Sequence, residues 1–227
     1  MTDTAHLKDR IADFLHSIPS GVRTIAVTKQ VSIEAMRTAY AAGVRDFGEN
    51  RIQEAEVKQA QLQDLTDVIW HFIGHLQSNK AQRAIELFDW IQSVDSLKLA
   101  QRIDRLAQGR DRRLQVCLQV KLISDPNKSG WSIDQLLLEL PLLNQLENLQ
   151  IRGLMIIAPI DLEADQTLQL FQSARDLAKK IEQQGFSRIC LDQLSMGMSD
   201  DYKLAIQAGA TMIRPGRVLF GARSLTK

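Results

Sequence analysis

Two glycine-containing segments near the C-terminus could bind a phosphate group. Residues 194–201 read LSMGMSDD and residues 213–217 read IRPGR, and each follows a predicted strand. Glycine lets an anion approach the backbone, free N–H groups at a helix start can donate to it, and the helix dipole favours negative charge. The alternative interpretation is that Ser199 only caps a helix and that Gly216 only turns the chain.

Lys29 could supply an amine, because it ends the apolar run at residues 25–29, IAVTK. An ammonium group partly removed from water loses its proton more readily and can then form a Schiff base with an aldehyde. An ordinary surface lysine at a strand end is the alternative. Asn50 and His75 follow two later strand-like runs, where they could bind a ligand oxygen or only satisfy loop backbone. His71, inside an apolar run, is expected to be a hydrogen-bonded core histidine.

The elements that must position these residues are eight predicted strands, each followed by a predicted helical segment. The strands cover residues 23–28, 45–48, 68–74, 90–94, 114–122, 151–158, 188–194 and 210–214. The segments after them begin near residues 32, 51, 78, 96, 133, 163 and 200, with a short turn at the end, and a further helix covers residues 6–16. Ser32 can cap the first of them, with Glu34 in its first turn. Strands joined by crossovers of this size pair in parallel.

Eight such units are the number that closes a barrel. Residues 154–158, LMIIA, are apolar without interruption, which is typical of a parallel strand covered on both faces. A doubly wound open sheet is the alternative, but no GxGxxG motif follows the first strand. We therefore predict an α/β fold, a single (β/α)8 TIM barrel over residues 1–227 with an extra N-terminal helix. Such barrels bind phosphate after strands seven and eight, where both glycine segments fall, and this favours the phosphate interpretation.

The composition argues against nucleic-acid and membrane partners. The 227 residues carry a net charge of +1 and are 44% hydrophobic. A nearly neutral chain has no general attraction to anionic surfaces, and the basic run at residues 110–113 is interpreted as a solvated loop. No signal-peptide pattern and no apolar run of about 18 residues is present.

The two cysteines, Cys117 and Cys190, both stand inside apolar runs. We expect two buried thiols in a reducing compartment, without a disulfide. Neither has a histidine or cysteine neighbour at ligand spacing, so no metal site is predicted. Together with the missing signal pattern, this indicates a cytoplasmic protein.

Several longer motifs together resemble the pyridoxal phosphate homeostasis protein family. They are VTK at 27–29, FGEN at 47–50, WHFIGHLQSNK at 70–80, KSG at 128–130, GLM at 153–155 and LSMGMSDD at 194–201. The match spans nearly the whole chain, so it is more specific than a single signature. Proteins of this family resemble the barrel domain of bacterial alanine racemase standing alone. The resemblance therefore implies a fold-type III barrel that binds pyridoxal 5′-phosphate.

The resemblance also implies roles for individual residues. Lys29 would hold the cofactor as an internal aldimine, and Arg214 would stand beside the pyridine nitrogen. The phosphate would be gripped by Ser195, Met196, Gly197, Gly216 and Arg217, with Asn50 and His75 lining the pocket near the ring.

The sequence departs from the family pattern at three positions. Many relatives have a small hydroxyl residue where Arg217 stands, an aliphatic residue in place of Pro215, and asparagine in place of Lys121. Backbone N–H contacts to phosphate survive such changes, although Pro215 itself offers no N–H.

The implied geometry argues against the obvious enzyme. An arginine at the pyridine nitrogen keeps that nitrogen unprotonated, which weakens the ring as an electron sink. Racemisation also needs a second acid/base opposite the lysine, and in the racemases that resemble this barrel an added C-terminal domain of the partner subunit supplies a tyrosine. The chain stops at Lys227, and its only tyrosines, Tyr40 and Tyr202, fall on predicted helices; Tyr202 is the one substitute near the phosphate segment.

The sequence therefore predicts a protein of pyridoxal phosphate homeostasis rather than an enzyme. It would buffer the cofactor or deliver it to PLP-dependent apo-enzymes, and so affect amino-acid and keto-acid metabolism, acting as a monomer. Two alternatives remain open: a fold-type III amino-acid racemase or lyase, and a lysine-dependent aldolase acting on a sugar phosphate.

Overall fold

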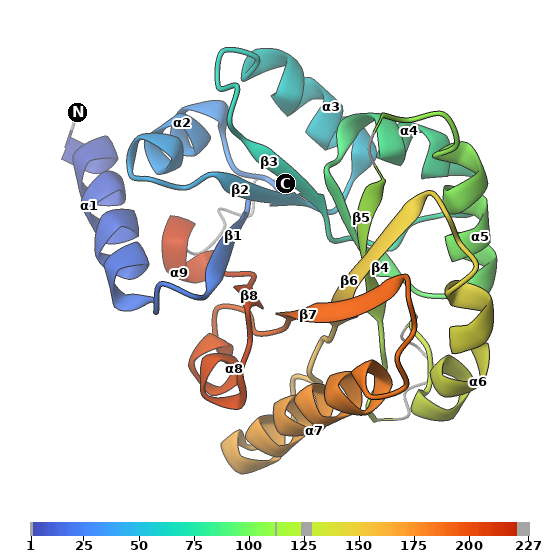
Figure 1. Cartoon of the computed structure of the whole chain (residues 1–227). Helices are drawn as coiled ribbons and strands as arrows, with labels where there is room; N and C mark the ends of the chain where they lie inside the picture. The colour runs from blue at the N-terminus through green and yellow to red at the C-terminus, as the bar shows by residue number, and fades with distance from the viewer. Residues whose placement is uncertain (1, 112, 124–128, 222–227) are drawn as a thin grey trace.

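Eight parallel strands close into a barrel in chain order (Figure 1). The computed structural model describes residues 2–111, 113–123 and 129–221. The strands are β1 Arg23–Val27, β2 Asp46–Glu49, β3 Ile69–Phe72, β4 Trp90–Val94, β5 Leu114–Gln119, β6 Leu149–Met155, β7 Ile189–Ser195 and β8 Met212–Ile213. β8 closes the barrel on β1 through the pairs Arg23 with Met212 and Thr24 with Ile213. The predicted eight-stranded barrel is confirmed.

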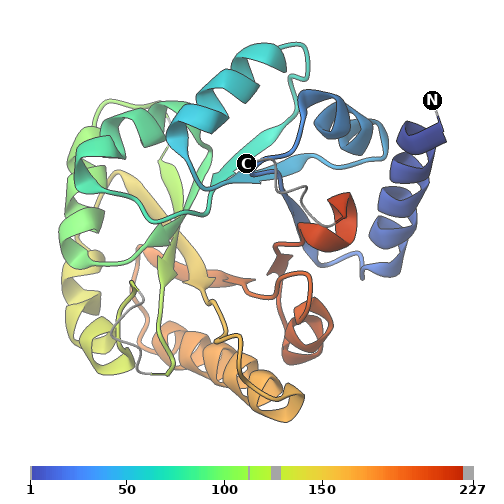
Figure 2. The ribbon, with the colours of Figure 1, turned by 180° about the vertical axis from the view of Figure 1, so that it is seen from behind.

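A ring of helices surrounds the strands, as the view from behind also shows (Figure 2). The helices are α1 Thr2–Ser17, α2 Ile33–Ala41, α3 Ile52–Gln61, η1 Ser78–Lys80, α4 Ala81–Leu87, α5 Leu97–Leu106, α6 Ile133–Leu143, α7 Ala164–Glu182, α8 Tyr202–Ala208 and α9 Arg217–Phe220. The extra N-terminal helix α1 lies against α2 and α9. Ser32 caps α2 as predicted, accepting a hydrogen bond from the Ala35 amide at 3.2 Å. Within the described ranges, no helix has both the length and the apolarity that crossing a membrane requires.

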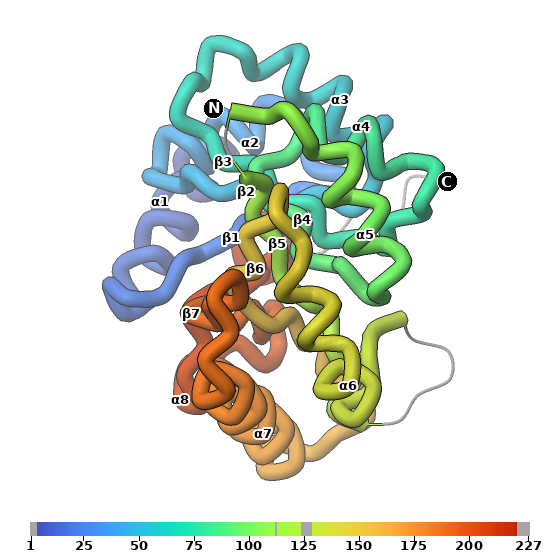
Figure 3. The backbone as a smooth tube through the Cα atoms, turned by 45° about the vertical axis from the view of Figure 1, so that its right-hand side comes forward, coloured from blue at the N-terminus to red at the C-terminus, as the bar shows by residue number. Residues whose placement is uncertain are grey.

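The longest helix, α7, packs beside α8 on the β6–β8 side of the barrel (Figure 3). A capping box between Glu163 and Gln166 starts it. Its buried residues recur at helical spacing, which lays one apolar stripe on the strands. They are Thr167, Leu170, Phe171, Ala174, Leu177, Ala178 and Ile181.

Three strands end at least two residues earlier than the sequence predicts. β3 ends at Phe72 rather than residue 74, β5 at Gln119 rather than 122, and β6 at Met155 rather than 158. The last paired positions of β5 and β6 are Gln119 and Met155, after which both chains open into loops at the mouth of the barrel. Ile157 is consequently 38% exposed, so the apolar run is not covered on both faces along its whole length.

The expectation of two buried thiols is wrong for one cysteine. Cys117 is buried in the barrel interior, where burial raises its pKa to about 12. Cys190 is exposed, because it shares with Asp192 the uncovered face of β7, whereas Ile189 and Leu191 alternate with them and are buried. An apolar sequence context did not reveal which face the side chain takes.

Gly153 allows β6 and β7 to approach each other at a register shift. A Cβ atom at this position would collide with the backbone carbonyl oxygen of Gln193 and lie 2.8 Å from its carbonyl carbon. A backbone group cannot move aside as a flexible side chain can, so only glycine fits here.

We predict that Gly153→Ala lowers the free energy of unfolding by about 2 kcal/mol, because overpacking forces a backbone shift. Gly21→Ala is the matched control: a Cβ atom there meets nothing within 4 Å, and alanine reduces the entropy of the unfolded chain. Urea denaturation of both variants measures the difference. Equal stability of the two variants would contradict the packing argument.

A buried ionic cluster ties α3 to the end of β1. Lys58 Nζ lies 2.8 Å from Glu49 Oε1 and 2.6 Å from Glu54 Oε1, and it donates to the carbonyl oxygen of Thr28 at 2.6 Å. Glu54 Oε1 also accepts the Gln30 amide at 2.5 Å. The peptide groups on both sides of Lys29 are therefore held by one pair of side chains from α3.

Two further observations show how strongly this cluster constrains the chain. Gln30 has φ of 61° and is the one non-glycine with positive φ in the described part of the protein, a conformation that side chains disfavour. Burial raises the pKa of the Glu49 carboxyl, against the hydrogen bonds from Lys58 and Thr28, and Glu49 Oε2 has no hydrogen-bond partner. The end of β1 is thus held in place at the expense of backbone strain at Gln30 and of a Glu49 carboxylate with one unbonded oxygen.

We predict that Lys58→Met lowers the free energy of unfolding by about 3 kcal/mol, since removing one partner leaves buried Glu49 uncompensated. Lys98→Met, at an exposed position of α5, is the control and should change stability little. Adding Glu49→Gln to Lys58→Met should recover part of the loss, because a neutral amide costs less to bury. Thermal and urea unfolding measure the stability of the two single variants and of the double variant. A Lys58→Met protein as stable as Lys98→Met would refute the role of the cluster.

Candidate functional site

The loops after β7 and β8, which carry the two glycine segments, are hydrogen-bonded to each other. The Arg214 amide donates to the Gly197 carbonyl oxygen at 2.8 Å. The Ser199 hydroxyl accepts the amides of Gly216 at 3.0 Å and Val218 at 3.3 Å, both at the start of α9. We call the Gly216 and Val218 amides with the Ser199 hydroxyl the cradle. Both amides donate to this hydroxyl here, so a phosphate group bound at the cradle would replace it as their acceptor.

The surrounding structure requires glycine at position 197 but not at position 216. Gly197 has φ of 91°, and a Cβ atom there would lie 2.6 Å from Ala205 Cβ and 2.9 Å from Tyr202 Cα. Both the backbone conformation and the packing therefore demand glycine. At Gly216 a Cβ atom would only touch Val27 Cβ at 3.4 Å, an ordinary contact, so the described residues leave room for a side chain there.

β1 ends beside this cradle. The Val27 amide donates to the carbonyl oxygen of Pro215 at 2.8 Å, and the Thr28 amide donates to that of Gly48 on β2 at 3.0 Å. Lys29, which follows directly, is half-buried. The two residues before Lys29 are therefore bonded to the Gly216 loop on one side and to β2 on the other. Asn50 is the first residue after β2.

Asn50 and His75 are less equivalent than the sequence suggests. Asn50 is half-buried, and a Cβ atom at Gly74 would lie 2.8 Å from Asn50 Cα, so the loop after β3 packs closely on it. The His75 side chain is 60% exposed, and its Nδ1 lies 3.1 Å from Asp95 Oδ2 and 3.2 Å from Ser129 Oγ. His75 therefore stands at the rim of the mouth.

Arg214 carries a positive charge into the interior. Its side chain is buried, with NH1 donating to Ser195 Oγ at 2.7 Å and NH2 donating to the Ile156 carbonyl oxygen at 2.8 Å. Burial lowers its pKa to about 10, and no carboxylate of the described residues lies within ion-pair distance. A guanidinium held by neutral acceptors can donate to a further neutral acceptor, such as a ring nitrogen.

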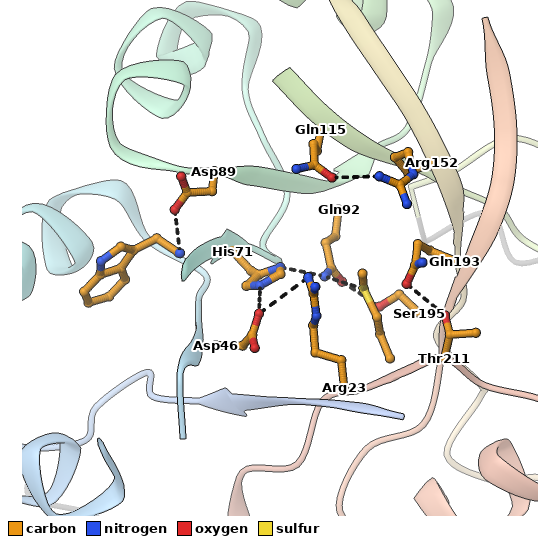
Figure 4. A network of polar contacts seen from close by, with 12 residues as sticks. Arg23, Asp46, His71, Asp89, Gln92, Gln115, Arg152, Gln193, Ser195 and Thr211 are labelled. Atoms are coloured by element: carbon orange, nitrogen blue, oxygen red, sulfur yellow. Dashed lines mark hydrogen bonds and ion pairs between the residues drawn. The ribbon is translucent and has the colours of Figure 1, made fainter. Parts of the chain in front are cut away.

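Three predicted phosphate ligands lie differently from the cradle. The Ser195 hydroxyl is directed into the barrel, where it donates to Gln92 Oε1 at 2.6 Å (Figure 4). The Met196 amide is already bonded to the Met212 carbonyl oxygen at 3.1 Å. The Arg217 side chain is 61% exposed and pairs with Asp200 at the surface, so its guanidinium lies away from the buried groups.

Ser199 is the hydroxyl that sequence reasoning undervalued. The sequence includes Ser199 in the phosphate segment, with a helix cap near Asp200 as the alternative, but does not single it out as a ligand. In the structure it bridges to the start of α9, and α8 begins later, at Tyr202. The signal that could have found it is its place in the same motif as Gly197, two residues on. The spacing cannot reveal the bridge, because that depends on how the β8 loop returns.

His71 is the core histidine that the sequence predicts, and this expectation is confirmed. It is fully buried, its Nε2 lies 2.8 Å from Asp46 Oδ1, and its Nδ1 lies 3.0 Å from Gln92 Nε2 (Figure 4). Burial lowers its pKa, against the effect of Asp46, so the ring is neutral at neutral pH.

A cavity of about 310 Å³ opens over the ends of β3, β5 and β6. It shares Ile156 with the Arg214 contact, and of the predicted site residues it contains His75 alone. Lys121, where relatives often have asparagine, also lines it. The cavity therefore lies beside the cradle and extends the mouth away from β8.

The tyrosines are engaged elsewhere. The Tyr202 ring packs against Phe14 of α1, with 5.2 Å between centroids, and the Tyr40 hydroxyl donates to Asp67 at 2.6 Å. No metal-binding group of histidine, cysteine and acidic side chains occurs in residues 2–111, 113–123 and 129–221. Lys128 of the KSG motif and Arg112 of the basic run lie outside these ranges.

Comparisons with known proteins agree with this geometry. The family model described as "Alanine racemase, N-terminal domain" matches residues 2–224. Alanine racemase from Clostridium difficile has a TM-score of 0.73 at 17% identity, covering 99% of this chain and 61% of that one, which shows a shared fold.

Two relatives are much more similar. The pyridoxal phosphate homeostasis protein of Synechocystis is 48% identical over 212 residues, covering 93% of this chain and 96% of its own length. The structure of PipY from Synechococcus elongatus, solved with PLP bound, has a TM-score of 0.90 at 52% identity and covers 95% of this chain and 100% of that one. The chain therefore belongs to the pyridoxal phosphate homeostasis protein family.

Proposed function

We propose that this protein binds pyridoxal 5′-phosphate at the mouth of the barrel and maintains its supply to other proteins. The observation that carries the proposal is the buried Arg214 guanidinium, held only by neutral acceptors beside the Gly216 cradle. PipY, 52% identical to this chain, was solved with PLP bound, and relatives bear the name pyridoxal phosphate homeostasis protein.

The groups present fit the chemistry of this cofactor. The amides of Gly216 and Val218 with the Ser199 hydroxyl suit the phosphate, and Arg214 suits the pyridine nitrogen. Gly197 provides the left-handed turn next to the cradle. Ser195 and Met196 are buried beneath it, and Arg217 would contribute its backbone at the start of α9. Asn50 and His75 would border the ring side of the site.

Lys29 is proposed to hold the cofactor covalently. Its amine would add to the cofactor aldehyde and lose water, so that the nitrogen and the former aldehyde carbon share an imine bond. Hydrolysis or transfer to another amine reverses this step and releases the aldehyde. Such reversible attachment suits a protein that buffers or delivers its ligand.

The same geometry favours holding over turnover. Arginine at the ring nitrogen would leave that nitrogen unprotonated and the ring a weaker electron sink. The Tyr202 ring packs on α1 and the Tyr40 hydroxyl bonds to Asp67, so neither supplies an evident second acid/base. We propose that the protein is a cytoplasmic monomer that delivers PLP to apo-enzymes. Light scattering of the purified protein would check the monomeric state.

We predict that the purified protein reconstituted with pyridoxal 5′-phosphate is yellow, and that borohydride reduction leaves a pyridoxyl group on Lys29. Lys29→Ala should lose the colour and the reduced adduct, whereas Lys98→Ala should keep both. Absorbance spectra and peptide mapping make the test. A wild-type protein that cannot be reconstituted would overturn the proposed function, and a colourless protein that traps a sugar phosphate would favour the aldolase.

We predict that the loaded protein does not catalyse loss of α-deuterium from amino acids over many turnovers. Proton exchange followed by NMR or mass spectrometry for free amino acids in large excess measures this. Lys29→Ala sets the background rate. Sustained exchange that requires Lys29 would show a racemase or related enzyme instead of a carrier.

A further inference from the structure

A chain of hydrogen bonds crosses the barrel interior and ends at Arg214. Its members, from the mouth inward, are Arg214, Ser195, Gln92, His71 and Asp46. The distances between successive partners are 2.7, 2.6, 3.0 and 2.8 Å. The members stand on or just after β8, β7, β4, β3 and β2. Figure 4 shows the inner four, with Arg23 reaching Asp46 from the other side at 3.6 Å.

The two ends of this chain force every link into one direction. A guanidinium can only donate, so Ser195 Oγ accepts from Arg214 and gives its single proton to Gln92 Oε1. The Gln92 amide nitrogen therefore faces His71 Nδ1 and must donate to it. The neutral imidazole then carries its proton on Nε2 and donates to the Asp46 carboxylate, which can only accept.

The members are held by more than their hydrogen bonds. The His71 ring stacks on Trp90, with 5.8 Å between centroids and 20° between planes. Gln92 Nε2 also lies 3.6 Å from the Met212 sulfur. Ser195, Gln92 and His71 are all on strands of the closed barrel, so none can shift without disturbing the sheet. A buried polar chain of this kind is stable only when every member is satisfied.

The polar chain runs through an interior that is otherwise filled mostly by apolar side chains. The neighbouring interior is filled by Ile25, Trp90, Cys117, Met155 and Met212, which need no partners. Arg214 itself is long and flexible, and Ser195 Oγ and the Ile156 carbonyl oxygen are its two guanidinium contacts among the described residues. The Ser195 hydroxyl presents its lone pairs to Arg214 only while its proton is committed to Gln92.

We propose that His71 and Gln92 are positioning residues, which act through Ser195 to hold the Arg214 guanidinium in place at the cofactor ring. This inference rests on the proposed binding of pyridoxal 5′-phosphate. Neither residue touches the cofactor. Their effect is to fix the proton of the Ser195 hydroxyl and thereby the direction in which Arg214 donates.

The test uses two variants remote from the mouth, His71→Phe and Gln92→Met, which break the chain and keep side-chain volume. Met155→Leu is the matched control, because it alters the same interior cluster without removing a member or a side-chain contact of Gln92. His71→Gln should restore function, since an amide can accept from Gln92 and donate to Asp46. The readouts are the absorbance band of the bound cofactor, the pH midpoint of its titration, the rate of cofactor release and the melting temperature of the unloaded protein.

We expect His71→Phe and Gln92→Met to shift the band and its pH midpoint and to release the cofactor about tenfold faster, the factor for losing one charge-assisted hydrogen bond. Met155→Leu should keep wild-type spectra and release, and His71→Gln should recover most of both. Folded chain-breaking variants with wild-type spectra and release would overturn the inference. A wild-type protein without a reducible adduct on Lys29 would instead overturn the proposed function.

A second measurement needs no substitution that risks folding. The direction of the chain requires His71 to be neutral with its proton on Nε2, and ¹⁵N NMR of labelled histidines in the loaded wild-type protein reports the tautomer. The expected result is one histidine in this form with slow proton exchange. A proton on Nδ1, or a doubly protonated ring near neutral pH, would contradict the inference even if both chain-breaking variants fail to fold.

Discussion

The burial of one positive charge organises the mouth of this barrel. The Arg214 guanidinium is buried, and no carboxylate of the described residues lies within ion-pair distance of it, although the more distant charge of Asp201 favours its protonated form. Its partners are a hydroxyl and a carbonyl oxygen, so the charge depends on dipoles that the strands fix in place. The other groups of the candidate site, the Gly216 and Val218 amides and the Ser199 hydroxyl, are uncharged.

The opposite side of the mouth is fixed by a different means. Lys29 stands between two peptide groups bound by Lys58 and Glu54, and the strained backbone of Gln30 follows it. The backbone that carries the Lys29 side chain is thus held on both sides. Because β1 also bonds to the loop before Gly216, a change in either region is transmitted to the other through one short stretch of backbone.

The sequence predicted the barrel because periodic strand–helix units are local, and the barrel brings the two glycine segments together because they follow neighbouring strands. It could not predict which hydroxyl enters the cradle, since Ser195 and Ser199 occupy the same motif and only the strand geometry turns one inward. Nor could it find the Lys58 cluster, whose partners are up to 30 residues apart. Cys190 was misplaced for a related reason: alternation along β7, rather than local apolarity, decides exposure.

The interior polar chain explains why a barrel that resembles an enzyme domain could serve as a holder. An enzyme gains rate by moving protons at the reacting atom, which requires groups near the ring that change protonation. Here His71, the one buried histidine of the described residues, is kept neutral and remote, and its proton is committed to Asp46. In the proposed arrangement His71 would serve to hold Arg214 still, and a ring environment without a mobile proton would favour retention over turnover.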